Sequence, residues 1–294
     1  MTTLENLPAN LDPTTDILAF MKATGQGSAR DGLDLPSLRV NYNDEDDDGN
    51  KIPLGHWSIF GPEGQVFAEE VTLRPMFATY QYSHFDVNAA QTLSTSVHFM
   101  DLMQKEVPDS TGGSKCGKLP RKVIDTLSEA EQKEQRDIKL SRVVFGLVTC
   151  EGVDRRGKKA KLKDLPCVFY ARGTHYMAVS NLLENLFRSR TPMQSQILRL
   201  ELKREKNKGV RYWTVIPTKE GEVEVTADDM AISADFCSTA VAESEAIENK
   251  YRIARAKMGD PDMRSVAEAV QPDVEIPWDD DIKDVGGNTV SPLS

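Results

Sequence analysis

The chain has 294 residues, of which 39% are hydrophobic, and it carries a formal net charge of −10. This length allows one large domain or two small ones, and the hydrophobic content is sufficient for a buried core. A run of about 18 apolar residues is absent, so no membrane-spanning helix is expected. The N-terminus lacks the pattern of a signal peptide, and four widely spaced cysteines suit a reducing compartment. These features predict a cytoplasmic protein.

The charge is distributed unevenly along the chain. Residues 1–50 carry 3 basic and 10 acidic side chains and residues 259–294 carry 2 and 9, so each end has a net charge of −7. Residues 115–219 hold 24 Lys and Arg against 11 Asp and Glu, a net charge of +13. Because a local positive field attracts phosphates, the basic centre indicates a nucleic-acid partner despite the acidic total.

The first fifty residues are expected to form an acidic N-terminal arm, with Leu38 and Val40 in a possible strand. An acidic run at 43–50 follows, and mutual repulsion favours a solvated loop. A calcium loop is the alternative, because Asp44, Asp46 and Asp48 have the required spacing. That loop would need a glutamate at its twelfth position, which is a glycine here.

Residues 57–82 have the pattern of short strands joined by turns. Residues 57–60 lead into the turn Gly61-Pro62-Glu63-Gly64, and residues 65–68 return from it. This part of the chain is rich in aromatic residues: Trp57, Phe60, Phe67, Phe77, Tyr80, Tyr82 and Phe85. Most of them are expected in a core, and one or two exposed rings would stack on bases.

The stretch from Lys139 to Pro217 is typical of a small closed β-barrel. Apolar runs at 142–149 and 167–171 flank a basic turn at 154–163, and a helix is expected at 176–187. A capping box, Ser128 with Glu131, predicts a charged helix before this stretch. Six cations of the basic turn are candidate contacts to a phosphate backbone: Arg155, Arg156, Lys158, Lys159, Lys161 and Lys163. A merely solubilising hairpin is the alternative.

A hairpin is predicted from Ile197 to Pro217, with Asn207-Lys208-Gly209 as a three-residue loop. This register places Lys203 opposite Trp213. The face expected in the core carries Leu200, Leu202, Thr214 and Ile216. The face expected to meet nucleic acid carries Arg199, Lys203, Arg211 and Trp213. Trp213 would stack on bases beside phosphate contacts, or it would pack under the helix at 176–187.

The last helix is expected to open at Thr226, with acids in its first turn, and to continue to about Met258. Beyond it the sequence has few apolar residues, which predicts disorder. The expected organisation is therefore an acidic arm (1–50), a nucleic-acid-binding core with a C-terminal helix (51–258) and a disordered acidic tail (259–294).

Catalytic chemistry is not indicated. The four histidines lack metal-ligand spacing and no Gly-x-Ser-x-Gly motif occurs, so we expect a non-enzyme without cofactor or metal. A metal-dependent nuclease remains an alternative, because its carboxylates need not be close in sequence. A virion or host-interaction protein whose acidic ends mimic nucleic acid is another.

The tail segment Asp273-Val274-Glu275-Ile276-Pro277-Trp278-Asp279-Asp280-Asp281-Ile282 resembles the acidic tail of bacterial and bacteriophage single-stranded DNA-binding proteins. In that family the tail docks replication and repair proteins and competes with DNA for the basic groove. The resemblance implies that Ile276, Trp278, Asp279, Asp280 and Asp281 bind such a partner. The family's tail finishes on its aromatic residue, whereas this chain continues to Ser294.

The segments 115–120 and 145–148 are similar to parts of phage-type members of this class, which have an OB-like barrel elaborated by helices. The resemblance implies an α+β fold with an OB-like antiparallel β-barrel and flexible acidic termini. It also implies a protein that coats single-stranded DNA without sequence specificity during phage replication or recombination. Such a protein would act in the host cytoplasm, and a homodimer is among the expected forms.

Overall fold

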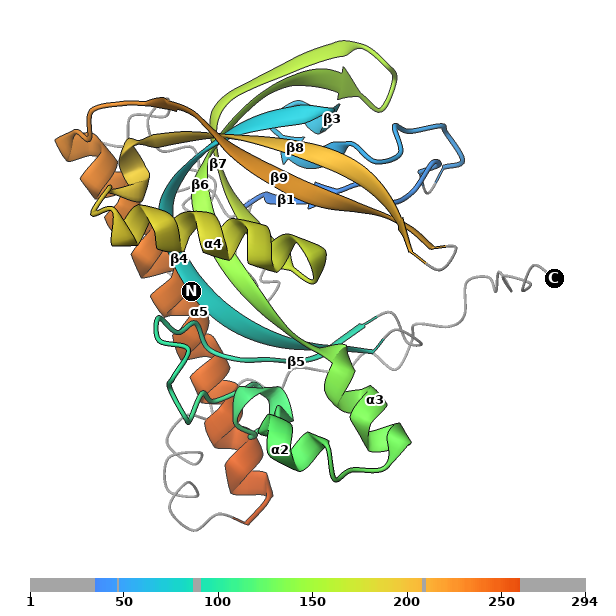
Figure 1. The fold of residues 1–294 in the computed structure, drawn as a ribbon, viewed down its shortest axis with the longest axis vertical. Helices are drawn as coiled ribbons and strands as arrows, with labels where there is room; N and C mark the ends of the chain where they lie inside the picture. The colour runs from blue at the N-terminus through green and yellow to red at the C-terminus, as the bar shows by residue number, and fades with distance from the viewer. Residues whose placement is uncertain (1–34, 47, 87–90, 208–209, 260–294) are drawn as a thin grey trace, which may run out of the picture.

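The computed structural model describes residues 35–46, 48–86, 91–207 and 210–259, and it has an α+β architecture (Figure 1). The strands are β1 (Ser37–Val40), β2 (Trp57–Gly61), β3 (Gly64–Ala68), β4 (Glu70–Asp86), β5 (Gln91–Thr95), β6 (Ile138–Asp154), β7 (Lys159–Arg172), β8 (Gln196–Asn207) and β9 (Val210–Glu222). The helices are η1 (Lys115–Gly117), α2 (Arg121–Ile124), α3 (Glu129–Asp137), α4 (Thr174–Arg188), η2 (Met193–Ser195) and α5 (Ala227–Lys257).

Five of these strands close a β-barrel. The pairings β1–β2, β2–β3, β3–β6 and β6–β7 are antiparallel, and a parallel pairing of β1 with β7 completes the ring. Neighbours around the ring therefore follow one another in chain order. Outside the barrel, β4 extends the sheet beyond β6 and pairs with β5 and with the β8–β9 hairpin. The expected class, a β-barrel elaborated with helices, is confirmed.

The barrel begins earlier in the chain than expected. Ser37 and Leu38 pair with Val168 and Phe169 of β7, and Val40 pairs with β2. Leu38 is 1% exposed in the core, so β1 is a barrel strand and the expected boundary at residue 50 is wrong. The rest of the arm, residues 1–34, lies outside the described residues, as does the tail from residue 260.

The barrel core is built by alternate residues of the strands. Trp57 is fully buried, meets Phe169 edge-on at 5.4 Å between ring centroids, and donates its indole N–H to the Leu200 carbonyl at 3.0 Å. Gly152 allows β6 to approach β3 closely, because a Cβ at this position would lie 2.0 Å from the Phe67 carbonyl oxygen. Barrel closure thus depends on a residue without a side chain.

The two long helices cover opposite faces of the sheet formed by β4 and β6. Val144 and Val148 belong to the same buried cluster as Val179 and Leu183 of α4. Phe145, one position along, instead packs with residues of α5. Because successive side chains of a strand point to opposite faces, α4 lies on one side of this layer and α5 on the other (Figure 1).

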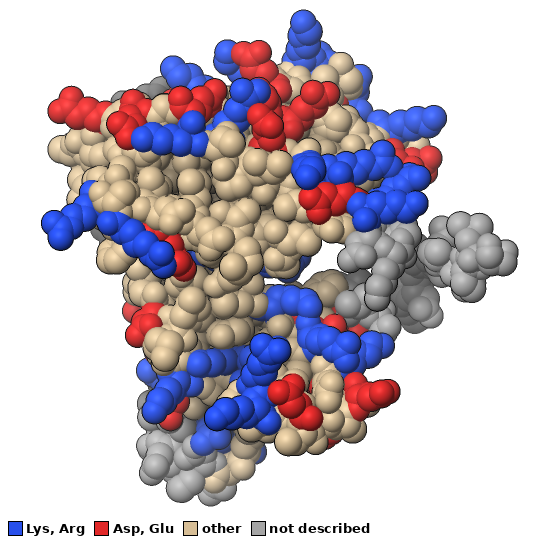
Figure 2. Space-filling view, in the orientation of Figure 1, with Lys and Arg blue, Asp and Glu red and all other residues tan. Residues whose placement is uncertain are grey.

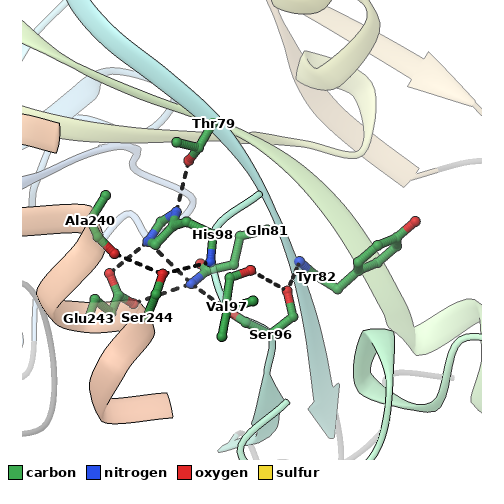
Figure 3. Close-up of polar contacts among 9 residues, drawn as sticks. All are labelled: Thr79, Gln81, Tyr82, Ser96, Val97, His98, Ala240, Glu243 and Ser244. Atoms are coloured by element: carbon green, nitrogen blue, oxygen red, sulfur yellow. Dashed lines mark hydrogen bonds and ion pairs between the residues drawn. The ribbon is translucent and has the colours of Figure 1, made fainter. Parts of the chain in front are cut away.

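Charged and polar contacts fasten α5 to the sheet. The predicted start of this helix is confirmed, with a capping box formed by Thr226 and Asp229, and the Asp229 carboxylate also binds Arg74 of β4 at 2.7 Å. Further along, the buried His98 ring lies 2.9 Å from the Glu243 carboxylate and 2.8 Å from the Thr79 hydroxyl (Figure 3). These contacts join α5 to β4 and to the segment that carries His98, which indicates a structural role.

The capping box of α3 at Ser128 and Glu131 is also confirmed. The expected helix at 176–187 is α4, which begins two residues earlier. Among the described helices, none combines the length and the hydropathy that crossing a membrane requires.

The register of the β8–β9 hairpin differs from the expected one by one residue. Asn207 pairs with Val210, so the loop has two residues and not three, and Arg204 rather than Lys203 lies opposite Trp213. A one-residue slip moves side chains to the other face of a strand. As a result Val215, not Ile216, is buried beside Leu200.

Candidate nucleic-acid interface

The β2–β3 and β6–β7 turns lie side by side and combine cations with an exposed aromatic ring. Pairing of Val66 with Asp154 brings the two turns together. Phe60 is 56% exposed, and the Arg155 guanidinium lies 5.9 Å from the centroid of its ring. The same guanidinium donates to the Gln65 side chain at 2.8 Å. Phe60 is therefore the exposed ring in this aromatic-rich part of the chain that lies beside a cation.

The expected basic turn is shorter than its sequence suggested. The turn itself ends at Lys158, where the Asp154 carboxylate accepts the backbone N–H groups of Arg156 and Lys158. Lys159 and the later cations lie on β7. We call Phe60 with the cations that form no ion pair to a described carboxylate the turn patch: Phe60, Arg155, Arg156, Lys158, Lys159 and Lys163.

Lys161 differs from the other candidates of this run. Its ammonium binds the Glu151 carboxylate at 2.6 Å, and this hydrogen bond raises the pKa of the lysine. Both residues border a depression of about 760 Å³ that Glu69, Glu70 and Lys159 also line, although Lys159 forms no ion pair there. Three carboxylates around this depression oppose a phosphate there, so Lys161 is the least available cation of the run.

The β8–β9 residues predicted to form one binding face are divided between two. Arg199 and Lys203 share a face on which their charges are compensated by glutamates. Arg199 binds Glu70 and, at 3.1 Å, Glu201, whereas Lys203 binds Glu205 at 3.5 Å. Arg211 is exposed and lies opposite Lys206, on the other face.

Trp213 is a core residue and not an exposed stacking ring. It is 9% exposed, meets the Tyr42 ring edge-on at 5.6 Å, and covers Gly55, where a Cβ would lie 2.3 Å from the indole. The Thr174 hydroxyl at the start of α4 donates to the Trp213 carbonyl at 3.4 Å. The expected outward orientation is wrong because the hairpin loop has one residue fewer.

A second aromatic and basic cluster lies on the α4 side of the sheet. The Arg142 guanidinium of β6 lies 4.1 Å from the centroid of the Tyr80 ring of β4, its direct cross-strand neighbour. Leu140, Tyr82 and Tyr176 of α4 are partly buried around Tyr80. Figure 3 shows Tyr82 pointing away from the His98 network, toward the opposite side of the sheet. We call these five residues the Arg142 cluster.

One face of the molecule is hollowed and carries basic residues. Figure 2 shows Lys and Arg on both sides of a hollow that separates the β8–β9 hairpin from α2 and α3. Lys118 and Lys139 are close enough that Lys139, together with burial as the larger cause, lowers the pKa of Lys118. Cations held so close favour an anion between them.

Local sequence patterns do not indicate the Arg142 cluster. Arg142 lies at the edge of an apolar run, and Tyr176 lies at the beginning of an expected helix. The apolar run and the aromatic density were both visible, but only the pairing of β4 with β6 places Arg142 on Tyr80.

Candidate metal ligands are not grouped in the part of the chain that the structure covers. No group of three or more His, Cys, Asp or Glu residues there could hold a metal ion. Asp44 and Asp46 belong to a loop in which the Asp46 carboxylate accepts the backbone N–H groups of Asp48 and Asn50. The tail candidates fall outside the described residues: Ile276, Trp278, Asp279, Asp280 and Asp281.

Comparison with protein-family models, with curated proteins and with solved structures finds no match to this chain.

Proposed function

We propose that this chain is a single-stranded DNA-binding protein, without enzymatic activity, that coats DNA irrespective of sequence during replication or recombination. The turn patch carries the proposal. Arg155 lies beside the exposed Phe60 ring, Arg156 and Lys158 belong to the adjoining turn, and Lys159 and Lys163 follow on β7, all five without an ion pair to a described carboxylate. Proteins that bind single strands combine such cations, which follow the backbone, with rings on which bases stack.

The contrast between compensated and uncompensated cations supports this location. Arg199, Lys161 and Lys203 each bind a glutamate, and a phosphate would have to compete with that carboxylate. The cations of the turn patch can bind a phosphate without breaking an ion pair of the described chain. The turn patch is therefore the first place where a phosphate backbone is expected to bind.

An OB-like role of the barrel is part of the same proposal. The barrel has the five strands and the closure that suit such a role, but an OB-fold is a Greek-key barrel. Here the ring follows chain order instead. The proposed likeness to OB-folds therefore concerns function and size and not strand order. In both, loops at one end of a small barrel would hold the DNA strand. The biological setting in phage replication, host-cytoplasmic location and partner docking through the acidic tail are proposed only from the resemblance of the tail.

The proposal is tested by fluorescence anisotropy with labelled single- and double-stranded oligonucleotides at several salt concentrations. The protein should prefer single strands, and log K should fall by about 0.7 per neutralised phosphate for each tenfold rise in salt. Replacing Lys158, Lys159 and Lys163 by Gln should reduce that slope by up to about 2.

A variant with the same change of charge controls for the overall field. Arg188, Lys203 and Lys219 each bind a glutamate, so replacing these three by Gln should leave the slope nearly unchanged. Equal effects of the two triple variants would contradict the turn patch. Absence of single-strand binding would contradict the proposed function, and magnesium-dependent loss of the oligonucleotide would identify a nuclease instead.

A further inference from the structure

Arg142 carries a charge that the described chain does not neutralise. It forms no ion pair with a described carboxylate, and its Nε is buried without a hydrogen-bond acceptor. Glu184 of α4 is near enough to influence Arg142, but its carboxylate forms an ion pair with Arg188 at 3.6 Å. Most guanidinium groups that are partly withdrawn from water bind a carboxylate or several carbonyl groups.

Burial makes this arrangement unfavourable in the free protein. Desolvation is the largest cause that lowers the pKa of Arg142, and the neighbouring Tyr80, Tyr176 and Glu184 oppose it only in part. The Tyr80 ring, 4.1 Å away, supplies a cation–π contact. A ring offers no hydrogen-bond acceptor in the plane of the guanidinium, so it does not engage the Nη donors, whereas the Nε is shielded from solvent.

The surroundings of Arg142 suit a nucleotide better than an isolated anion. Tyr82 and Tyr176 are half-buried and pack in the same cluster as Tyr80, the ring on which Arg142 lies. Tyr82 is stacked on Phe99 at 5.5 Å with an interplanar angle of 13°, which fixes the orientation of its ring. A guanidinium flanked by fixed aromatic rings matches a phosphate flanked by bases.

We infer that Arg142 binds a backbone phosphate of single-stranded nucleic acid, with Tyr82 and Tyr176 as the adjoining surfaces for bases. This inference rests on the proposed function and adds a second contact region on the α4 side of the sheet, apart from the turn patch. The bound phosphate accepts hydrogen bonds from the guanidinium and neutralises its charge. Binding of the strand thereby removes an unfavourable feature of the free protein.

Two substitutions of Arg142 test the inference in the full chain. Arg142→Met keeps an unbranched side chain on Tyr80 but removes the charge. Arg142→Lys keeps the charge but loses the planar set of guanidinium N–H donors. Arg142→Met should weaken binding of a labelled oligothymidine about tenfold or more and reduce the salt slope by about 0.7. Arg142→Lys should have a smaller effect on affinity and leave the slope unchanged.

Thermal unfolding without DNA distinguishes this role from a structural one. Because Arg142→Met removes a partly buried charge that has no ion pair, the melting temperature of the free variant should equal or exceed that of the unmodified protein. Arg252→Met is the matched control, since it removes a cation of α5 that pairs with Glu248 on the other side of the sheet, and its oligonucleotide affinity should not change.

The possible outcomes separate this inference from the proposed function. A lower melting temperature with unchanged oligonucleotide affinity would make Arg142 a structural residue and overturn the inference while leaving the turn patch in place. Equal losses of affinity for Arg142→Met and Arg252→Met would also overturn it, because they would show a general effect of charge. Failure of the unmodified protein to bind oligothymidine would overturn the proposed function and this inference together.

Discussion

Replacing Trp213 by Ala tests the corrected register of the β8–β9 hairpin. The indole is 9% exposed and contacts Tyr42 and Gly55, so the substitution leaves a cavity in the core. Truncations of buried Trp to Ala cost about 3–5 kcal/mol. In a domain of this size each kcal/mol lowers the melting temperature by roughly 2–4 °C. The melting temperature should therefore fall by about 10 °C in calorimetry, and oligonucleotide affinity measured well below the transition should not change.

Replacing Phe60 by Ala is a control with the opposite expected result, little change in stability and a loss of DNA affinity. Its ring is 56% exposed, so Phe60→Ala should change stability by less than about 0.5 kcal/mol. It should weaken oligonucleotide binding by roughly 1–3 kcal/mol if bases stack on the ring. A Trp213→Ala protein that melts normally but loses DNA affinity would refute both the register and the assignment of the stacking ring.

Three further predictions concern pH and the acidic tail. Burial, with Arg172 as a smaller cause, lowers the pKa of His175 from 6.5 to about 4. The unfolded chain therefore binds the proton more tightly, and the free energy of unfolding should fall by up to about 3 kcal/mol between pH 6.5 and 4. Urea titrations of the protein and of His175→Asn should show this loss only in the former. The hydrogen bond from Arg74 lowers the pKa of Asp229 from 3.8 to about 2, so its contribution should be lost as pH falls through that window, but not in Asp229→Asn. Residues 273–284 have a net charge of −5, so deleting residues 272–294 should tighten oligonucleotide binding at low salt. That gain should disappear as the screening length shortens to about 10 Å at 0.1 M salt, and no gain at low salt would contradict competition by the tail.

Helix boundaries could be predicted because their signals are local. The Thr226 and Ser128 capping boxes need only residues within one turn, and both occur where the sequence placed them. The turn between β2 and β3 was likewise visible in four consecutive residues. Such features depend on hydrogen bonds between backbone groups and side chains a few residues away, so they form independently of the rest of the fold.

The faces of the β8–β9 hairpin could not be predicted, because they depend on a loop whose length the sequence leaves open. Asn207-Lys208-Gly209 is compatible with a three-residue loop, and Lys208-Gly209 with a two-residue loop. A three-residue loop predicts Trp213 on the surface, whereas a two-residue loop places it in the core. The decisive contacts, with Tyr42 and Gly55, come from a distant part of the chain.

The sequence also does not show which cations are free to bind a phosphate. In the sequence, Arg199 has the character of a free cation. In the structure, the pairing of β4 with β8 places Glu70 beside it, and the two form an ion pair. Lys161 is compensated by its partner across the β6–β7 hairpin, Glu151. A basic segment therefore predicts that phosphates are attracted, but only the pairing of strands decides which of its cations can bind them.

The two proposed contact regions, the turn patch and the Arg142 cluster, lie near opposite ends of β6, and this geometry predicts the size of the proposed binding site. From Arg142 to Arg155 the chain advances thirteen residues, which at about 3.3 Å per residue is at most about 43 Å along the strand. Phosphates of one strand in a duplex are about 3.4 Å apart, so a DNA strand that contacts both regions spans up to about 13 nucleotides. That length lies within the range of about 4–16 nucleotides bound by single barrels.

In anisotropy titrations an oligothymidine of about 15 residues should lose affinity additively with Arg142→Met and with the triple turn-patch variant. One of about 4 residues can reach only one region at a time, so the combined variant should weaken it less than the sum of the two effects. Equal affinity of the unmodified protein for the two lengths would show that one short site holds the strand, and the two regions would then not act on the same DNA.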